Sequence, residues 1–225
     1  MPAATTESRR ALAARVRGLY AVTPDLPDTR DIVARVDAAI RGGAAAIQYR
    51  SKTADAATRE TQARALADAC RGRALYIVND DAALAARVGA DGVHVGEDDP
   101  DIDAARRALG GRGIVGVSCY DQLVRARAAV AAGADYVAFG SFHPSAVKPG
   151  ARRADMALLG LARPLGVPVV AIGGITAANA APLVAAGADA LAVISDVFAH
   201  AEVADVARAA RALAAIFATA ATSAA

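Results

Sequence analysis

The first residues that could do chemistry form the segment QYRSK, residues 48–52, which follows an apolar run typical of a strand. Because side chains alternate along an extended chain, Gln48, Arg50 and Lys52 are expected to point to the same side. An amide, a guanidinium and an ammonium placed together predict a clamp for a polyphosphate. The alternative is that Arg50 and Lys52 are two solvated cations in a loop.

Carboxylates follow the next two apolar runs. The first of these runs ends on Asn79 and Asp80, and the second is followed by Glu97, Asp98 and Asp99. Facing carboxylate loops repel each other unless a cation lies between them, and Mg²⁺ shared with a phosphate group prefers such oxygen ligands. The spacing therefore predicts a magnesium site.

Helix capping is the alternative interpretation of some of these carboxylates. Asp81 precedes the helical segment AALAARV, and Asp98 or Asp101 precedes IDAARRAL. An Asp in such a position accepts hydrogen bonds from the free N–H groups of the first helical turn. We expect capping to explain some of the carboxylates but not both clusters.

The longest connection between predicted strands is GSFHPSAVKPGARRA, residues 140–154. A long loop that is stiffened by prolines and carries Lys148 is typical of an active-site segment. Ser118 lies at the end of the fifth predicted strand. His143 is interpreted as a polar surface residue rather than a general base, and His94, inside a predicted strand, as a packed or hydrogen-bonded core residue.

Two glycines, Gly173 and Gly174, follow the seventh apolar run, and Ile194 and Ser195 follow the eighth. Glycines allow backbone N–H groups to approach an anion, and this region of a barrel is the usual phosphate site. The pattern predicts a monophosphate site. Two anionic sites indicate two phosphorylated substrates or one bisphosphate.

Eight short apolar runs alternate with Ala-rich amphipathic segments, which predicts a parallel sheet covered by helices. A Gly-Ala-Asp lead into the strand recurs in VGADGVHVG, AGADYVAFG and AGADALAVI, as a glycine that ends each helix would produce. We predict a single (β/α)8 TIM barrel, with an open doubly wound sheet as the alternative. The residues above then fall at the C-terminal ends of the strands, where barrels carry their chemistry. The predicted strands are 19–23, 45–49, 75–79, 91–95, 114–118, 135–139, 168–172 and 190–194.

The composition agrees with one catalytic domain of this kind. The chain has 225 residues, of which 55% are hydrophobic, and a net charge of +2, which gives no support for a nucleic-acid or membrane-surface partner. No apolar run reaches the length of a membrane span, and the N-terminus lacks the apolar centre of a signal peptide, so we expect a cytoplasmic protein with small-molecule partners. Cys70 and Cys119 lack metal or disulfide spacing. We expect an N-terminal extension or helix at 1–17, the barrel at 18–213 and a frayed Ala-rich tail at 214–225.

The motifs QYRSK, VNDD, GVHVGEDD, GVSC, FGSFHPSAVK and AIGGIT with VIS, taken in this order, resemble those of the thiamine-phosphate synthase family. The likeness runs from about residue 18 to about residue 200. It implies a (β/α)8 barrel that requires Mg²⁺. It also implies the condensation of 4-amino-5-hydroxymethyl-2-methylpyrimidine diphosphate with 4-methyl-5-(2-phosphoethyl)thiazole, which gives thiamine phosphate and pyrophosphate.

The resemblance also implies roles for the residues. The metal ligands would be Asp80 and Asp99. The residues that stabilise the leaving diphosphate, and are catalytic in this sense, would be Arg50, Lys52, Ser118 and Lys148. The residues that bind substrate would be Gln48, Tyr49, Arg50, Ser51, Lys52, Asn79, Ser118 and Lys148 on the diphosphate side, and Ser145, Ala146, Val147, Gly174, Ile194 and Ser195 on the thiazole-phosphate side.

The chemistry of the family fits this set of residues. An aminopyrimidine can stabilise a methylene cation, so the diphosphate departs first and the thiazole nitrogen then adds. Such a step needs charge neutralisation and alignment more than a catalytic His or Cys. One departure is Val147, because the family commonly has Thr before the loop lysine. We predict that the loss of this hydroxyl weakens thiazole-phosphate binding.

Three other functions remain as alternatives. A thiazole tautomerase of the same barrel family tends to lack the metal-binding aspartates, so Asp80 and Asp99 favour the synthase. A non-catalytic regulator that binds a thiamine precursor would keep the phosphate site but would not need the acidic cluster. A sugar-phosphate isomerase or epimerase would need an acid–base pair across the barrel, and the sequence indicates none.

Overall fold

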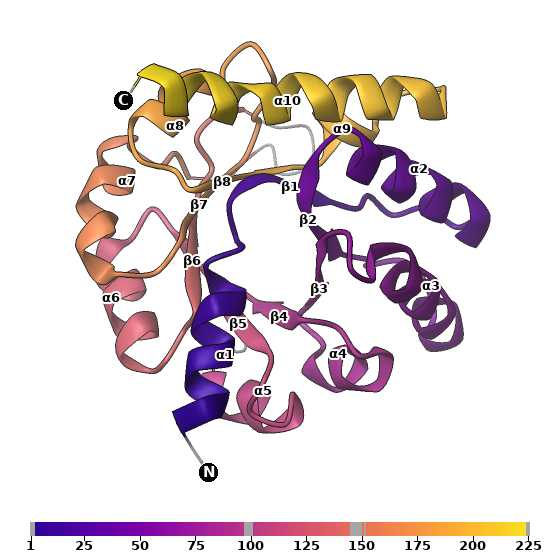
Figure 1. Cartoon of the computed structure of the whole chain (residues 1–225), viewed down its shortest axis with the longest axis horizontal. Helices are drawn as coiled ribbons and strands as arrows, with labels where there is room; N and C mark the ends of the chain where they lie inside the picture. Colours follow the sequence, from indigo (N-terminus) through magenta and orange to yellow (C-terminus); the bar gives the residue numbers. More distant parts are fainter. Residues whose placement is uncertain (1–2, 97–100, 145–149, 151, 224–225) are drawn as a thin grey trace.

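Eight parallel strands pair in chain order in the computed structural model, which describes residues 3–96, 101–144, 150 and 152–223 (Figure 1). The last strand pairs with the first, so the sheet is closed and the open doubly wound alternative is wrong. The predicted (β/α)8 barrel is confirmed, and each predicted strand overlaps an observed one. The strands are β1 (Gly18–Val22), β2 (Ala44–Tyr49), β3 (Leu75–Asn79), β4 (Gly92–Val95), β5 (Ile114–Tyr120), β6 (Tyr136–Phe139), β7 (Val169–Ile172) and β8 (Ala190–Val193).

Helices cover the outside of this barrel, and side-chain caps fix where several of them begin. Asp28 and Asp55, for example, accept hydrogen bonds from the first-turn N–H groups of α2 and α3. The helices are α1 (Ala3–Ala13), α2 (Thr29–Arg41), α3 (Ala56–Cys70), α4 (Ala82–Val88), α5 (Ile102–Ala108), α6 (Leu123–Ala131), α7 (Ala157–Ala162), the 3₁₀ helix η1 (Arg163–Leu165), α8 (Ala181–Ala185), α9 (Ser195–Phe198) and α10 (Val203–Ser223).

The repeated Gly-Ala-Asp sequence has a structural explanation. Its glycines, Gly89, Gly133 and Gly187, all have positive φ angles, of 68°, 97° and 112°, which glycine adopts more readily than other residues. The Asp that follows accepts a hydrogen bond from the backbone N–H at the start of the preceding strand, which fixes the register of two neighbouring strands. The pairs are Asp91 with Tyr76 (2.8 Å), Asp135 with Val115 (2.8 Å) and Asp189 with Val169 (2.9 Å).

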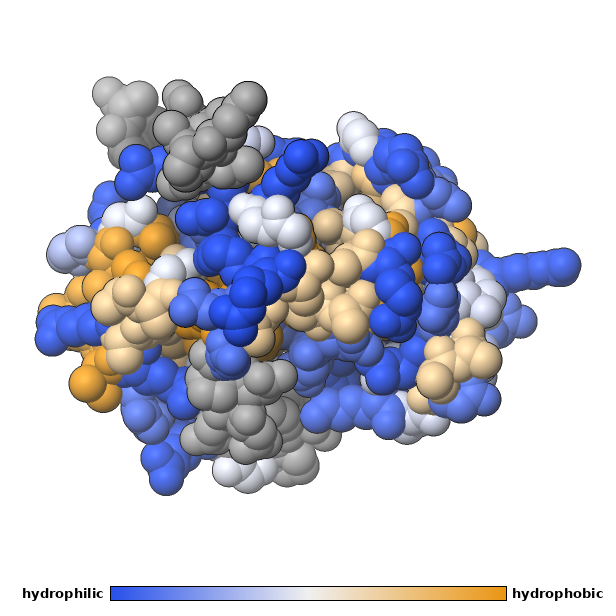
Figure 2. All heavy atoms as spheres, turned by 90° about the horizontal axis from the view of Figure 1, so that it is seen from below, coloured by the Kyte–Doolittle hydropathy of each residue, from blue (hydrophilic) through white to orange (hydrophobic). Residues whose placement is uncertain are grey.

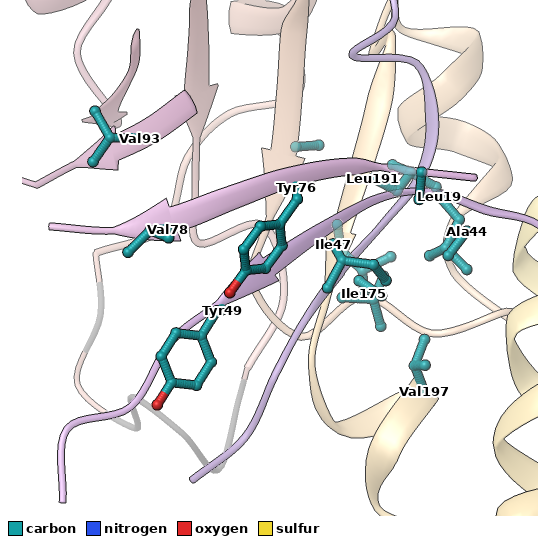
Figure 3. Packing of buried hydrophobic residues seen from close by; sticks show 14 of the residues in the cluster. Leu19, Ala44, Ile47, Tyr49, Tyr76, Val78, Val93, Ile175, Leu191 and Val197 are labelled. Carbon is teal, nitrogen blue, oxygen red and sulfur yellow. The ribbon is translucent and has the colours of Figure 1, made fainter. Parts of the chain in front are cut away.

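Side chains that point outward from the strands form the main core against the helices. Figure 3 shows Tyr49 and Tyr76 pointing the same way from the neighbouring strands β2 and β3. Both rings are buried against α3, where the Tyr49 hydroxyl donates to Gln62 Oε1 (2.9 Å) and the Tyr76 hydroxyl to the Ala63 carbonyl (3.0 Å). Each buried hydroxyl therefore has the partner that it needs.

The N-terminal end of the barrel is closed by the first residues of the chain. Helix α1 lies against β5 (Figure 1), and Arg9 Nε donates to Asp135 Oδ1 at 2.9 Å. Ala13 and Val16 pack in one cluster with the first residues of β3, β5 and β8. The C-terminal end of the barrel is therefore the end that remains available for a ligand.

The C-terminal helix α10 packs along α2 and also contacts α8 and α9 (Figure 1). It runs from Val203 to Ser223 and so continues past residue 213, where the sequence analysis placed the start of the tail. Alanine is the strongest helix former, and Ile216 and Phe217 pack against the core.

Hydrophilic side chains cover most of the face drawn in Figure 2, with apolar side chains gathered toward one side. The large hydrophobic side chains exposed in the described part of the chain are Val124, Met156 and Leu161. No helix of this part of the chain is both long enough and apolar enough to cross a membrane.

Candidate active site

A cavity of about 440 Å³ opens at the C-terminal end of the barrel, and all eight strands or the residues that directly follow them contribute to its wall. Each strand carries an inward side chain at this end because alternate residues of a barrel strand point inside. Of the predicted site residues, Gln48, Arg50, Asn79, Ser118 and Ile194 line this main cavity. The structure thus brings together residues that lie up to three strands apart in the barrel.

A smaller cavity of about 230 Å³ adjoins the main one between β7 and β8. All four residues of the predicted monophosphate site line it, namely Gly173, Gly174, Ile194 and Ser195. The two cavities share part of their walls, so ligands bound in them would lie next to each other. The shared residues are Ile172, Gly173, Ala192 and Ile194.

Backbone geometry at the smaller cavity explains the Gly-Gly sequence. Gly174 has a φ angle of 63°, and a Cβ placed there would lie 2.3 Å from the Pro144 carbonyl oxygen. Asn179 holds the turn, because its Nδ2 donates to the Gly174 carbonyl (3.0 Å) and its Oδ1 accepts from Thr176 N (2.8 Å). The next helix begins only at Ala181, because Asn179 binds the backbone in a non-helical turn.

A chain of hydrogen bonds crosses the interior of the barrel from β2 to β5. Gln48 Nε2 donates to the Tyr20 hydroxyl (3.0 Å), which lies 2.9 Å from the Tyr136 hydroxyl. The Tyr136 hydroxyl lies 3.1 Å from His94 Nδ1, and His94 Nε2 lies 2.9 Å from Ser118 Oγ. We call these five hydrogen-bonded residues, Gln48, Tyr20, Tyr136, His94 and Ser118, the polar chain. All of them except Tyr136 line the main cavity, to which they present hydrogen-bond donors and acceptors.

The polar chain is uncharged at neutral pH. Burial lowers the pKa of His94 to about 4, so its imidazole is neutral. Burial raises the pKa of Tyr20 to about 12, although hydrogen bonds from Tyr136 and Gln48 oppose the rise, and burial also raises that of Tyr136. The floor of the main cavity is therefore suited to a neutral polar ring rather than to a phosphate.

Arg50 supplies positive charge at the β2 side of the main cavity. Two hydrogen bonds fix its backbone to Thr23 Oγ1 (2.9 and 3.1 Å), and its guanidinium lies 3.6 Å from Asp25. Burial raises the pKa of Asp25, but backbone hydrogen bonds from Lys52 and Thr53 and the charge of Arg50 outweigh this effect, so the pKa lies below its usual value. Asp25 therefore stays ionised and orients Arg50.

Three predicted contact residues of the same segment do not line the described cavities. Lys52 is exposed in a bend, with its backbone N–H on Asp25 Oδ1 (2.5 Å), because β2 ends at Tyr49 and strand alternation does not continue as far as this lysine. The Tyr49 side chain faces α3. Ser51 Oγ accepts a hydrogen bond from Ala54 N at 3.4 Å.

Asp80 stands apart from the capping carboxylates. Asp81 caps α4 through Leu84 N (2.7 Å) and Asp101 caps α5 through Ala104 N (2.7 Å), so capping accounts for these two residues as the sequence suggested. Asp80 caps no helix, and its backbone has a φ angle of 63°. Its carboxylate accepts a hydrogen bond from Asn79 Nδ2 (2.6 Å) and is exposed at the rim.

Part of the predicted metal site and of the long loop lies outside the described residues. Among the residues that the structure describes, no group of three or more His, Cys, Asp or Glu side chains is close enough to hold a metal. Asp80 nevertheless fits a hard cation, because its carboxylate is exposed and supplies oxygen ligands. Its Oδ1 lies beside Gly96, where the chain leaves β4, since a Cβ added to Gly96 would be 3.7 Å from it. The predicted residues outside the described part are Glu97, Asp98, Asp99, Ser145, Ala146, Val147 and Lys148.

The sequence prediction missed several residues of the main cavity. Tyr20 was not identified, although a tyrosine at an inward strand position requires a partner for its hydroxyl. His94 is hydrogen-bonded within the core, as interpreted, but it also lines the cavity. Asp121 and Arg152 line it from loops, where no strand periodicity could have revealed them. His143 is not among the described residues that line either cavity.

A closed (β/α)8 barrel with a glycine turn for an anion at β7 and β8 defines the broad class of barrel enzymes that act on small phosphorylated molecules. Within this class, residues 19–197 match the family model described as thiamine monophosphate synthase. The chain belongs to this family and is a transferase.

Individual relatives agree with this assignment. The thiamine-phosphate synthase of Thiobacillus denitrificans is 59% identical over 183 residues, which cover 80% of this chain and 87% of the relative. The thiamine-phosphate synthase of Thioalkalivibrio sulfidiphilus is 57% identical over 82% of this chain and 89% of its own length. A solved structure of thiamine phosphate pyrophosphorylase from Pyrococcus furiosus superposes with a TM-score of 0.80, at 34% identity, over 92% of this chain and 98% of that one.

Proposed function

We propose that this protein condenses 4-amino-5-hydroxymethyl-2-methylpyrimidine diphosphate with 4-methyl-5-(2-phosphoethyl)thiazole to give thiamine phosphate and pyrophosphate. The observation that carries the proposal is the pair of adjoining cavities with a shared wall. A reaction between two small phosphorylated molecules needs two such spaces, with the reacting atoms at their junction. The names of the relatives support the same reaction.

In this proposal the polar chain holds the aminopyrimidine ring. The ring is neutral and has both donor and acceptor nitrogens, which suits the neutral side chains of Gln48, Tyr20 and His94. Apolar residues of the cavity wall, such as Val22 and Val170, would cover the faces of the ring. Orientation by short, buried hydrogen bonds would direct the methylene carbon of the substrate toward the shared wall.

The diphosphate of this substrate would lie at the β2 to β5 rim, where Arg50, Asn79 and Ser118 line the cavity. A fixed guanidinium offers two parallel donors to phosphate oxygens. Asp80, with Asp99 from outside the described residues, would hold Mg²⁺, since both supply the hard oxygen ligands that this ion prefers. Bound there, Mg²⁺ would neutralise charge on the leaving group.

The reaction requires no proton transfer from the protein at the bond-breaking step. The bond between the methylene carbon and the diphosphate oxygen breaks, and its electron pair leaves with the diphosphate. The amino group of the ring stabilises the resulting cation, and the lone pair of the thiazole nitrogen then forms the new carbon–nitrogen bond. Arg50 stabilises the departing charge, and Gly174 and Ser195 hold the second substrate through its phosphate.

The test is to incubate the purified protein with both phosphorylated precursors, with Mg²⁺ in one sample and EDTA in the other, and to measure thiamine phosphate by mass spectrometry. We expect product only with the metal. Product in EDTA would contradict the metal requirement. Absence of product in both samples, while the thiazole phosphate still binds, would contradict the synthase and favour the tautomerase or the regulator.

A further inference from the structure

Arg152 is a second cation in the wall of the main cavity and has no part in the roles described above. It lies in the connection between β6 and α7, whereas Arg50 follows β2, four strands away around the barrel. Among the described residues that line either cavity, these two arginines are the Lys or Arg residues present. Two positively charged side chains therefore line the main cavity from opposite sides of the barrel.

The backbone of Arg152 is fixed beside the wall that the two cavities share. Its carbonyl oxygen accepts a hydrogen bond from Ser141 N (3.1 Å), and Ala154 N donates to the Ser141 carbonyl (2.9 Å), so Ser141 holds the returning loop at Arg152 and at Ala154. Ser141 in turn packs against Gly173, since a Cβ at Gly173 would lie 2.2 Å from Ser141 Oγ. Gly173 lines both cavities, so Arg152 is anchored next to their junction.

The two arginines differ in their partners. Arg50 has Asp25 at 3.6 Å, which compensates part of its charge. No carboxylate of the described residues lies within ion-pairing distance of Arg152, and its guanidinium has no hydrogen-bond partner among them. A guanidinium at the wall of a cavity, without a carboxylate partner among the described residues, is suited to binding an anion from solution.

The lining of the smaller cavity contains no cation among the described residues. Its described lining contains glycines, apolar side chains, Thr176, Ser195 and the carboxylate of Asp196, but no Lys or Arg. Among the described residues, backbone N–H groups and two hydroxyls would have to bind a phosphate dianion next to that carboxylate. A cation reaching from the junction would balance the charge.

We propose that Arg152 binds the phosphate of the substrate held in the smaller cavity and so sets the affinity for the thiazole phosphate. This inference rests on the proposed function for the identity of that substrate. Arg50 and Arg152 then bind different anions. Arg50 binds the diphosphate at the β2 side, and Arg152 binds the monophosphate at the β7 and β8 side. The division keeps two anionic substrates apart while their reacting atoms meet.

The adjacent Arg153 provides a matched control, because it is also exposed but does not line either cavity. We would compare Arg152→Ala, Arg152→Lys and Arg153→Ala by calorimetric binding of the thiazole phosphate and by the KM for each substrate. We expect Arg152→Ala to weaken thiazole-phosphate binding roughly 10- to 100-fold, the usual effect of losing a charged hydrogen bond. The KM for the diphosphate should not change, Arg152→Lys should recover part of the affinity, and Arg153→Ala should behave as the parent protein.

Unchanged thiazole-phosphate binding in Arg152→Ala would overturn the inference, and so would a loss confined to the diphosphate substrate. An equal loss in Arg153→Ala would also overturn it, because the effect would then be one of general surface charge. The binding measurement does not depend on turnover. If the parent protein forms no thiamine phosphate but binds the thiazole phosphate through Arg152, the proposed function fails and the inference stands.

Discussion

Removing the Tyr136 hydroxyl tests whether the polar chain is one cooperative unit. In Tyr136→Phe the ring remains, but the hydrogen bonds to the Tyr20 hydroxyl (2.9 Å) and to His94 Nδ1 (3.1 Å) are both lost. All three side chains are buried, so no bulk water replaces the missing partner. The two halves of the chain, Gln48–Tyr20 and His94–Ser118, are then no longer joined.

The size of the effect follows from these contacts. A net hydrogen bond contributes about 1 kcal/mol, and a buried group left without a partner costs about 1–3 kcal/mol, so we expect a loss of roughly 2–4 kcal/mol in the free energy of unfolding. For a chain of this size that corresponds to a fall in Tm of about 5–15 °C. Tyr76→Phe removes one buried hydrogen bond, to the Ala63 carbonyl, and should cost only about 1 kcal/mol.

The assay is urea unfolding of both variants, followed by circular dichroism, together with the KM and kcat for the pyrimidine diphosphate. Tyr136→Phe should lower kcat/KM for this substrate, whereas Tyr76→Phe should not, because Tyr76 faces α3. The double variant Tyr20→Phe with Tyr136→Phe should lose less stability than the sum of the single variants, since the two hydroxyls bond each other. A Tyr136→Phe loss no greater than that of Tyr76→Phe, with strict additivity in the cycle, would refute the cooperative chain.

Three further predictions concern the neutral histidine, the glycine turn and the metal. Burial lowers the pKa of His94 from near 6.5 to about 4, so the unfolded state binds more protons than the folded state between these pH values. The free energy of unfolding should therefore fall by up to roughly 3 kcal/mol as the pH drops through this window. His94→Gln should flatten this part of the pH profile of urea unfolding. Gly174→Ala should abolish calorimetric binding of the thiazole phosphate, since the new Cβ would lie 2.3 Å from a carbonyl oxygen. Gly72 is the control, because it has a similar φ angle and a Cβ added there would have no atom within 4 Å. Gly72→Ala should lower the free energy of unfolding by only about 1 kcal/mol. Asp80→Ala should remove Mg²⁺-dependent turnover and spare thiazole-phosphate binding, and unchanged turnover would exclude Asp80 as a ligand.

The fold could be predicted from the sequence because the apolar runs and the turn sequences between them both indicate a parallel sheet covered by helices. The apolar runs have the length of barrel strands, and the Gly-Ala-Asp repeat supplies both the turn and the hydrogen bond that sets the strand register. Closure could not be derived from periodicity, since it depends on the pairing of β8 with β1 across the whole chain. The end of the C-terminal helix could not be read from the sequence, because its alanine residues give no clear end signal, although Phe217 packs against the core.

The candidate site was predicted where strand ends determine position and missed where other elements do. Gln48 and Ser118 follow from strand alternation, and both line the main cavity. Lys52 does not line it, because a bend intervenes after β2. Arg152 lies in a long loop, and hydrogen bonds from Ser141 to the backbone of Arg152 and Ala154 hold this part of the loop beside β7. Long-range hydrogen bonds of this kind have no periodic signal in a sequence.

The distribution of charge within the barrel matches the chemistry that we propose. Neutral side chains such as Tyr20 and His94 form the interior surface, and their pKa values keep them neutral across the physiological range. Charged groups lie beyond the ends of the strands, where Arg50, Asp121 and Arg152 line the main cavity and Asp80 is exposed. A positively charged floor would bind a phosphate inside the barrel and would repel the carbocation of the proposed reaction. In that reaction the neutral floor would leave the phosphates at the rim, on opposite sides, and the two rings would meet between them.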